Sequence, residues 1–281
     1  MNGITAKKAG RVLLYIFLIA TSAAFLAPII IVLYNSFKGK FFISDDPFAL
    51  PNAETFSGIE NYIGGIEKTG FPAAFGWSLF ITVFSVAAIV LFTSMTAWYI
   101  VRVKNKFTKA LYYIFVFSMI VPFQMVMFTM TKTVADLGLD KPWGLIIVYL
   151  GFGAGLAVFM FTGFVKSMPI AIEEAAMIDG CNPLQIFFQV VCPILKPTMI
   201  STAILETMWV WNDYLLPTLV LDIKTFRTIP MAIQYFRGSY GKVEMAPMMA
   251  CIMITVLPVI VLYLVCQKYI IDGVVAGAVK G

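Results

Sequence analysis

The chain has 281 residues, of which 60% are hydrophobic and only 12% are charged, and its formal net charge is +5. A soluble domain carries about 25% charged residues, so this composition excludes an ordinary soluble protein. Together with a mean hydropathy of +0.90, it favours a protein that spans a membrane.

Long apolar runs follow one another along the chain. A run of about 20 apolar residues spans a bilayer as a helix, because lipid offers no hydrogen-bond partners to the backbone. The sequence therefore predicts an all-α polytopic membrane protein with six transmembrane helices. Their expected bounds are 12–36, 72–101, 110–131, 142–165, 198–221 and 246–268.

The first run contains the small residues 21–24, which would suit a signal-peptide cleavage site. Its apolar stretch continues to Leu33 and is longer than the core of a signal peptide, so we expect it to be retained.

Basic residues indicate the orientation. Six helices place both termini on one side, where the loops hold eleven basic and four acidic residues, a net charge of +7; the opposite loops hold nine of each. By the positive-inside rule, both termini are expected in the cytoplasm and the chain in the cell membrane. The net charge then reflects topology and indicates no nucleic-acid partner.

Residues typical of catalysis are scarce. The chain has no histidine, and its four cysteines show no C-x-x-C spacing, which argues against a hydrolase centre and against a zinc site. The stretch Gly238–Lys242 lacks the spacing of a phosphate-binding loop. We therefore expect no catalytic, metal-binding or cofactor-binding residue in this chain.

The longest expected cytoplasmic segment, residues 166–197, interrupts the apolar pattern with a charged helix–turn–helix. Glu173 and Glu174 fall near the positive end of the first helix, and Gly180 suits a turn with positive φ. The pattern alone fits a solvated hairpin as well as a docking element. The further start signals are Ser167 and Pro169 for the first helix and Asn182 and Pro183 for the second.

This segment resembles the EAA signature of ABC-importer permeases, which is Glu-Ala-Ala, three residues, Gly, nine residues and Ile-x-Leu-Pro. The chain reads Glu174-Ala175-Ala176, then Gly180, then Val190-Val191-Cys192-Pro193, with Cys192 in place of leucine. Two other stretches, Trp211-Asn212-Asp213 and the tail 272–281, resemble the MalG-type subunit of carbohydrate importers. The resemblance covers essentially the whole chain.

The resemblance implies a type I ABC importer fold with a cytoplasmic EAA coupling helix. It also implies partners: a second permease subunit, two ATPase subunits that bind ATP and Mg, and an extracytoplasmic solute-binding protein. Docking of the EAA helix on the ATPase is then assigned to Glu174, Ala175, Ala176, Asp179, Gly180 and Pro193.

In MalG-type relatives, the outer loop that corresponds to residues 222–245 is a scoop that enters the binding protein. A solvated connection is the alternative for this loop. The expected tip of the scoop is Arg237, Gly238, Ser239, Tyr240, Gly241 and Lys242.

The fifth apolar run carries acids. Acids within a membrane helix are costly and usually face a cavity or a partner. Carboxylate and amide groups can bind sugar hydroxyls, and tryptophan can cover a sugar face, but contact with the second permease is an open alternative. The expected substrate-path residues are Glu206, Trp209, Trp211, Asn212 and Asp213.

Two other spans carry backbone signals. Gly151 and Gly155 predict a face for close helix packing, and Pro122 indicates a kink in the third span.

The predicted function is the permease subunit of an ATP-driven importer of a sugar, most simply an oligosaccharide. One alternative is an importer of a polyamine or a phosphate ester. The others are an ion-driven secondary carrier, for which an EAA segment has no use, and a membrane enzyme.

Overall fold

The computed structural model describes residues 2–234, 236 and 243–278, of which 2–9 and 269–278 are described by their backbone alone. Every regular element in this part of the chain is a helix, and Lys38 and Phe56 form an isolated bridge. The chain divides into two compact units: residues 1–71 with 233–257, and residues 72–232 with 258–281.

The first unit contains α1 (Asn2–Asn35), α2 (Lys40–Asp45), α3 (Glu60–Thr69) and the start of α13 (Met245–Ala278). Polar contacts order the segment that follows α1: the Lys38 ammonium donates to the Asp46 carbonyl at 2.9 Å, and the Asn61 amide donates to the Ser36 carbonyl at 2.8 Å. At Gly65, α3 lies so close to α13 that a Cβ atom would come 2.8 Å from the Cys251 sulfur.

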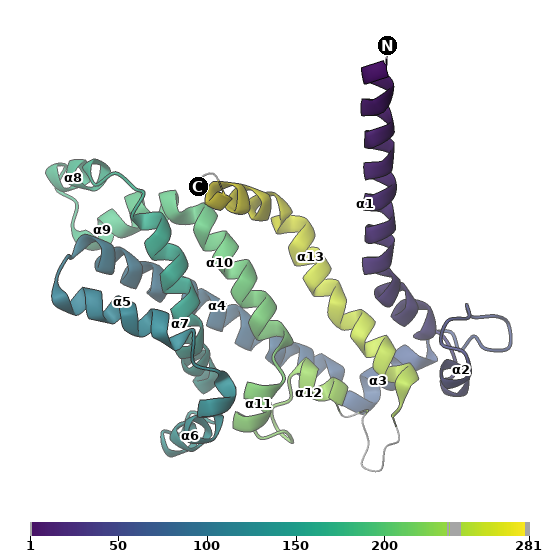
Figure 1. Cartoon of the computed structure of the whole chain (residues 1–281). Coiled ribbons are helices and arrows are strands. Elements are labelled where there is room, and N and C mark those ends of the chain that lie inside the picture. Colours follow the sequence, from purple (N-terminus) through teal and green to yellow (C-terminus); the bar gives the residue numbers. More distant parts are fainter. Residues whose placement is uncertain (1, 235, 237–242, 279–281) are drawn as a thin grey trace. The chain divides into compact units, whose positions relative to one another are not determined.

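The second unit carries both regions of functional interest. Figure 1 shows α8 and α9 beyond one end of α7 and α10, and α6 and α11 near the other end. Its elements are α4 (Phe71–Arg102), α5 (Lys106–Ser118), α6 (Phe123–Asp136), α7 (Pro142–Val165), α8 (Ala171–Ile178), α9 (Pro183–Gln185), the π-helix η1 (Ile186–Val191), α10 (Cys192–Asn212), α11 (Leu215–Val220), the first part of α12 (Ile229–Gln234) and the end of α13.

Helix α7 is central to the second unit, where it packs against α5 and α10. Its sequence is apolar on all sides, as expected for a helix surrounded by other helices. Pro142 stands at its first turn, where the missing N–H costs nothing. Leu145, Ala157 and Phe161 of this helix are completely buried.

Five helices in the described part of the chain are long and apolar enough to cross a membrane, and the number is six if the bent pair α5 and α6 forms one span. The expected span 110–131 is not one continuous helix, because α5 and α6 meet at 107° across residues 119–122. Pro122 precedes α6 in an extended conformation, so the kink predicted there is confirmed.

The expected span 198–221 also differs from the structure. Helix α10 starts earlier, at Cys192, and ends at Asn212, and the short α11 follows. Asp213 has extended backbone and accepts hydrogen bonds from the amides of Leu215 and Leu216 at 2.9 and 3.3 Å. These local bonds stop α10 and start α11.

The π-helix η1 leads directly into α10. Pro193 follows it, and a proline ring in a helix clashes with the carbonyl four residues earlier, here that of Gln189. A wider π turn accommodates the proline, and such turns are often found at functional sites.

Candidate functional site

The turn between α8 and α9 is built from backbone hydrogen bonds. Gly180 has φ of +85°, which confirms the positive φ predicted for it. The Cys181 amide donates to the Ala176 carbonyl at 3.0 Å and the Gly180 amide donates to the Met177 carbonyl at 3.1 Å. These two bonds form a Schellman motif, which satisfies the carbonyls at the end of α8.

The next helix is capped just as tightly. The Asn182 side chain accepts from the Gln185 amide at 3.0 Å, and the Gln185 side chain accepts from the Asn182 amide at 2.8 Å. This reciprocal pair is a capping box, so the predicted cap at Asn182 is confirmed. The turn is therefore held at both of its ends.

The start of α8 differs from the prediction. The helix begins at Ala171, with Ile170 before it, so Ser167 is not its cap. The Ser167 hydroxyl instead donates backwards to the Phe164 carbonyl of α7 at 2.7 Å.

One face of this hairpin is exposed and largely apolar. Met177, Ile178 and Leu184 are 56%, 86% and 59% exposed. Glu174, Ala175 and Asp179 are exposed on the same segment. The segment lies between predicted spans and α8 has only eight residues, too few to cross a bilayer. Exposed apolar side chains outside lipid mark an interaction surface.

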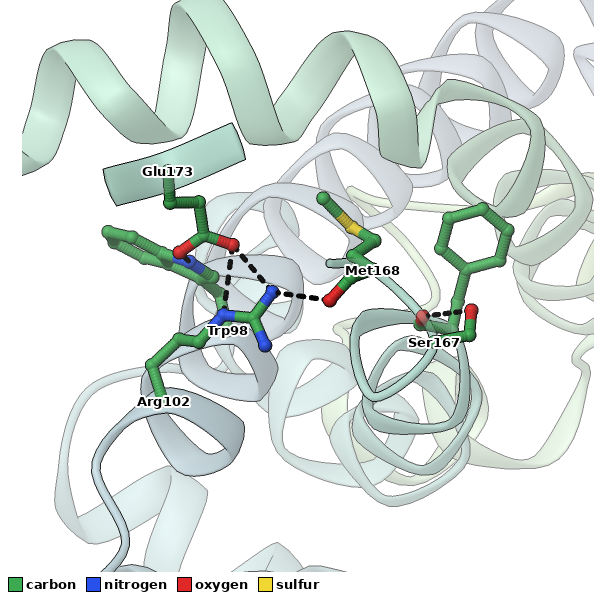
Figure 2. Close-up of polar contacts among 6 residues, drawn as sticks. Trp98, Arg102, Ser167, Met168 and Glu173 are labelled. Carbon is green, nitrogen blue, oxygen red and sulfur yellow. Dashed lines mark hydrogen bonds and ion pairs between the residues drawn. The ribbon is translucent and has the colours of Figure 1, made fainter. Parts of the chain in front are cut away.

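Glu173 is buried and faces α4 (Figure 2), whereas its neighbour Glu174 is exposed. Arg102, at the end of α4, donates from Nε and Nη2 to one oxygen of the Glu173 carboxylate at 2.9 and 2.6 Å. Trp98, one turn earlier on α4, donates from its indole to the other oxygen at 2.9 Å. Both carboxylate oxygens are therefore occupied by donors.

The same cluster also holds the segments on either side of α8. Nη2 of Arg102 donates to the Met168 carbonyl at 3.2 Å, just before α8. The ring of Trp98 lies 5.7 Å from that of Phe187, a fully buried residue of η1. We call Glu173, Arg102 and Trp98 the α4–α8 joint.

Sequence reasoning missed this joint. It treated Arg102 as a loop charge and Glu173 as a helix-end acid, although the apolar Ala176 three residues after Glu173 shares its buried face. Spacing alone gives no signal for it, because Glu174 is likewise followed three residues later by an apolar residue, Met177, which is exposed.

A second feature is a cavity of about 570 Å³ among the helices of the second unit. Polar and aromatic side chains contribute to its wall, including those of Gln124, Trp209 and Glu206. Its other lining residues are Ser118, Met119, Val121, Phe123, Phe152, Gly153, Leu156, Leu205, Asp213, Leu215 and Leu216.

Glu206 is the unusual member of this wall. It is 2% exposed, and its Oε1 atom has no hydrogen-bond partner among the described residues. A Cβ atom at Gly153 would lie 2.9 Å from the other carboxyl oxygen and 2.7 Å from the Ile89 side chain. The glycine therefore leaves the space in which Glu206 lies.

Asp213 is already partnered. Besides the two backbone amides of α11, its carboxylate accepts from the Tyr149 hydroxyl at 3.0 Å. Tyr149 is fully buried and its ring meets that of Trp209 edge to face at 5.4 Å. Asp213 thus fixes the end of α10 at the edge of the cavity.

The structure does not bring the remaining predicted path residues into this cavity. Trp211 is 5% exposed, stacks edge to face on Phe75 at 5.8 Å and lines a separate apolar groove with α4 and α13. The Asn212 side chain donates to the Met208 carbonyl at 2.7 Å in its own helix. The helical period explains the split, since residues 209 and 211 lie about 200° apart around a helix.

The predicted glycine face is correct at one of its two positions. A Cβ atom at Gly155 would lie 2.7 Å from the Ser118 hydroxyl, whereas nothing lies within 4 Å at Gly151. Close packing therefore uses Gly153 and Gly155.

The predicted binding-protein tip, residues 237–242, lies outside the described residues. In the described part of the chain, no group of three or more Cys, Asp or Glu side chains is placed to hold a metal ion.

Comparisons with known proteins match both the length and the fold. Residues 89–275 match the family described as binding-protein-dependent transport system inner membrane component. One relative is the permease protein AmyC of a starch degradation products transport system from Thermoanaerobacterium thermosulfurigenes. The two sequences are 38% identical, and the matched region spans 93% of this chain and 94% of AmyC. The permease protein MsmG of a multiple sugar-binding transport system from Streptococcus mutans is 33% identical, over 95% of this chain and 96% of its own.

A solved structure has the same fold. It is the crystal structure of a bacterial ABC transporter involved in the import of the acidic polysaccharide alginate, with a TM-score of 0.79, 22% identity, and coverage of 94% of this chain and 97% of the other. The chain therefore belongs to the family of inner membrane components of binding-protein-dependent transport systems.

Proposed function

We propose that this chain is the permease subunit of an ATP-driven importer for an oligosaccharide, with the EAA segment as its contact with an ATPase. The capped α8–α9 hairpin carries this proposal, because it presents an exposed apolar tip, with Ile178 86% exposed, on a stiff support. The relatives named above belong to transport systems for starch degradation products and multiple sugars, which supports a carbohydrate as the solute.

Docking on the ATPase uses the outward face of the hairpin. Ala175 keeps that face shallow, so that another protein can approach the helix closely, and Glu174 and Asp179 offer charges for a basic partner. Gly180 and Pro193 shape the turn and the entry into α10. Two ATPase subunits hold ATP and Mg, and this chain supplies no cofactor of its own.

The remaining partners follow from the same importer architecture. A second permease subunit completes the path, and a solute-binding protein delivers the sugar at the outer loop, with residues 237–242 at the contact. The basic loops and both termini then lie in the cytoplasm.

Glu206 and Trp209 form the part of the sugar path that this chain contributes. The free carboxyl oxygen accepts a hydroxyl group, and the exposed part of the Trp209 ring covers an apolar sugar face. Asp213 supports the wall through Tyr149. Burial of Glu206 against the second permease is the competing use of the same group.

A second candidate solute is a polyamine, because a buried carboxyl group without a described cation partner also suits an amino group.

The test is uptake by the complete transport complex purified from its native membranes into proteoliposomes. We expect uptake of an oligosaccharide that needs both enclosed ATP and the binding protein. Uptake driven by an ion gradient without ATP would contradict the importer, and ATP-driven uptake of spermidine but not of oligosaccharides would favour the second candidate.

A further inference from the structure

The joint between α8 and α4 has no role in the docking proposed above, because Glu173 faces away from the ATPase side. Among the described side chains of α8, that of Glu173 is the one with hydrogen bonds to another element. We infer that Glu173, held by Arg102 and Trp98, is a positioning residue that transmits the movement of the EAA hairpin to α4. This inference rests on the proposed function, since it supposes that an ATPase moves the hairpin.

The geometry suits a contact that must carry force. Three N–H groups bind the two oxygens of one carboxylate, and the contact between Arg102 and Glu173 is as short as 2.6 Å. Charge-assisted bonds of this length are the stronger class of hydrogen bond. The side chains of Arg102 and Glu173 are 16% and 2% exposed, so water competes little for either group.

The joint holds the hairpin at three successive points. Met168 precedes α8, Glu173 lies in its first turn, and Phe187 follows in η1; each contacts Arg102 or Trp98. The end of α4 therefore binds the hairpin as a unit, and the hairpin cannot tilt without moving α4 or breaking these contacts.

Helix α4 also packs beside a residue of the cavity wall, Gly153. Ile89 lies thirteen residues before Arg102 on the same unbroken helix, a distance of about 20 Å along its axis. The side chains of Ile89 and Glu206 both lie next to Gly153, within 3 Å of where a Cβ atom would be. If the end of α4 moves at the joint, the continuous helix moves Ile89 with it, and Ile89 lies beside the part of the wall that contains Glu206.

The first test compares Glu173→Gln with Glu54→Gln in the complete complex in proteoliposomes. Glu54 is exposed and its side chain has no described contact, so it is the matched isosteric control. The readouts are retention of the ATPase subunits and the number of solute molecules imported per ATP hydrolysed. For Glu173→Gln we expect the ATPase to stay bound and this ratio to fall by about tenfold, because the amide replaces a charged acceptor with a group that is half donor.

Trp98→Phe is the second variant, because Glu173→Gln could prevent assembly. Phenylalanine keeps a ring against Phe187 and removes one of the three donors. We expect a ratio about threefold below wild type with assembly intact. A wild-type ratio for Trp98→Phe, together with either a wild-type ratio or a failure to assemble for Glu173→Gln, would overturn the joint. A lowered ratio for Trp98→Phe supports it in either case.

The proposed function fails in a different way. If it is wrong, the wild-type complex itself shows no ATP-dependent uptake. If only the joint is wrong, the wild-type complex imports solute with ATP and the joint variants match it in solute moved per ATP.

Discussion

Two glutamates of this chain are almost equally buried and have opposite surroundings. Glu173, 1% exposed, has both carboxylate oxygens bound by Arg102 and Trp98. Glu206, 2% exposed, has an oxygen with no described partner and faces a cavity of about 570 Å³. A buried polar group that is fully bonded stabilises one arrangement, whereas one that is left open is available to something else. Burial alone therefore does not separate the structural acid from the candidate binding acid, but the count of partners does.

The largest effect is expected where the paired glutamate loses its partner. Arg102→Ala leaves the Glu173 carboxylate buried without its cation, and breaking such a pair costs about 3–5 kcal/mol. We expect the purified protein in detergent to lose that much free energy of unfolding, measured by denaturant titration. Lys104→Ala, an exposed position two residues later, is the control and should change little. Equal stability of the two variants would show that the pair is not formed.

The space around the unpaired glutamate is the next target. In Gly153→Ala the new methyl group would meet Ile89 at 2.7 Å and Glu206 at 2.9 Å, and such overpacking costs about 1–3 kcal/mol. Gly151→Ala is the matched control, because nothing lies within 4 Å of it, and alanine favours a helix by about 1 kcal/mol. Both variants gain this helix propensity and only Gly153→Ala meets neighbouring side chains, so it should unfold at a lower temperature than Gly151→Ala. An equal or higher unfolding temperature for Gly153→Ala would contradict the packing at Gly153.

Gly180→Asp examines the hairpin that the joint holds. The left-handed conformation at φ +85° costs a residue with a side chain about 1–2 kcal/mol. The added carboxylate also stands beside the docking surface. We expect uptake to be lost and the ATPase to be retained less well, while the variant still reaches the membrane. Normal uptake would contradict the placement of the coupling helix.

The smallest effect on stability is expected for Glu206→Gln. The side chain keeps its size and no described ion pair is broken, so the free energy of unfolding should change by less than about 1 kcal/mol. Transport should respond instead: an amide still binds a hydroxyl group, so oligosaccharide uptake should be reduced but measurable, whereas uptake of a polyamine should be abolished. A large loss of stability with failed assembly would favour contact with the second permease.

The sequence predicted those features that depend on neighbouring residues. The apolar runs located the long helices, Gly180 and Asn182 marked the turn, and Pro122 marked the break between α5 and α6. Each of these signals acts through the backbone of its own segment, so a single sequence contains it.

Other features depend on contacts between distant segments. Glu173 and Glu174 are adjacent and chemically identical. Their roles, buried and exposed, differ because Arg102, 71 residues earlier in the chain, binds only Glu173 of the two. Asp213, at the end of α10, likewise accepts from the Tyr149 hydroxyl, 64 residues earlier in the chain, and nothing in the sequence pairs these two residues. Trp211 was grouped with Trp209 because the two are close in sequence. In the structure Trp209 lines the cavity, whereas Trp211 lines the separate apolar groove.

The most direct test of the central claim is a photo-crosslinker placed at Ile178, the most exposed large apolar residue of the hairpin, in cells that contain the whole transport system. Phe117, 66% exposed on α5 and within an apolar run, is the control position. The account predicts that the probe at Ile178 captures a nucleotide-binding ATPase subunit and that the probe at Phe117 does not. An efficiently inserted, transport-competent protein whose Ile178 probe captures no ATPase would contradict it.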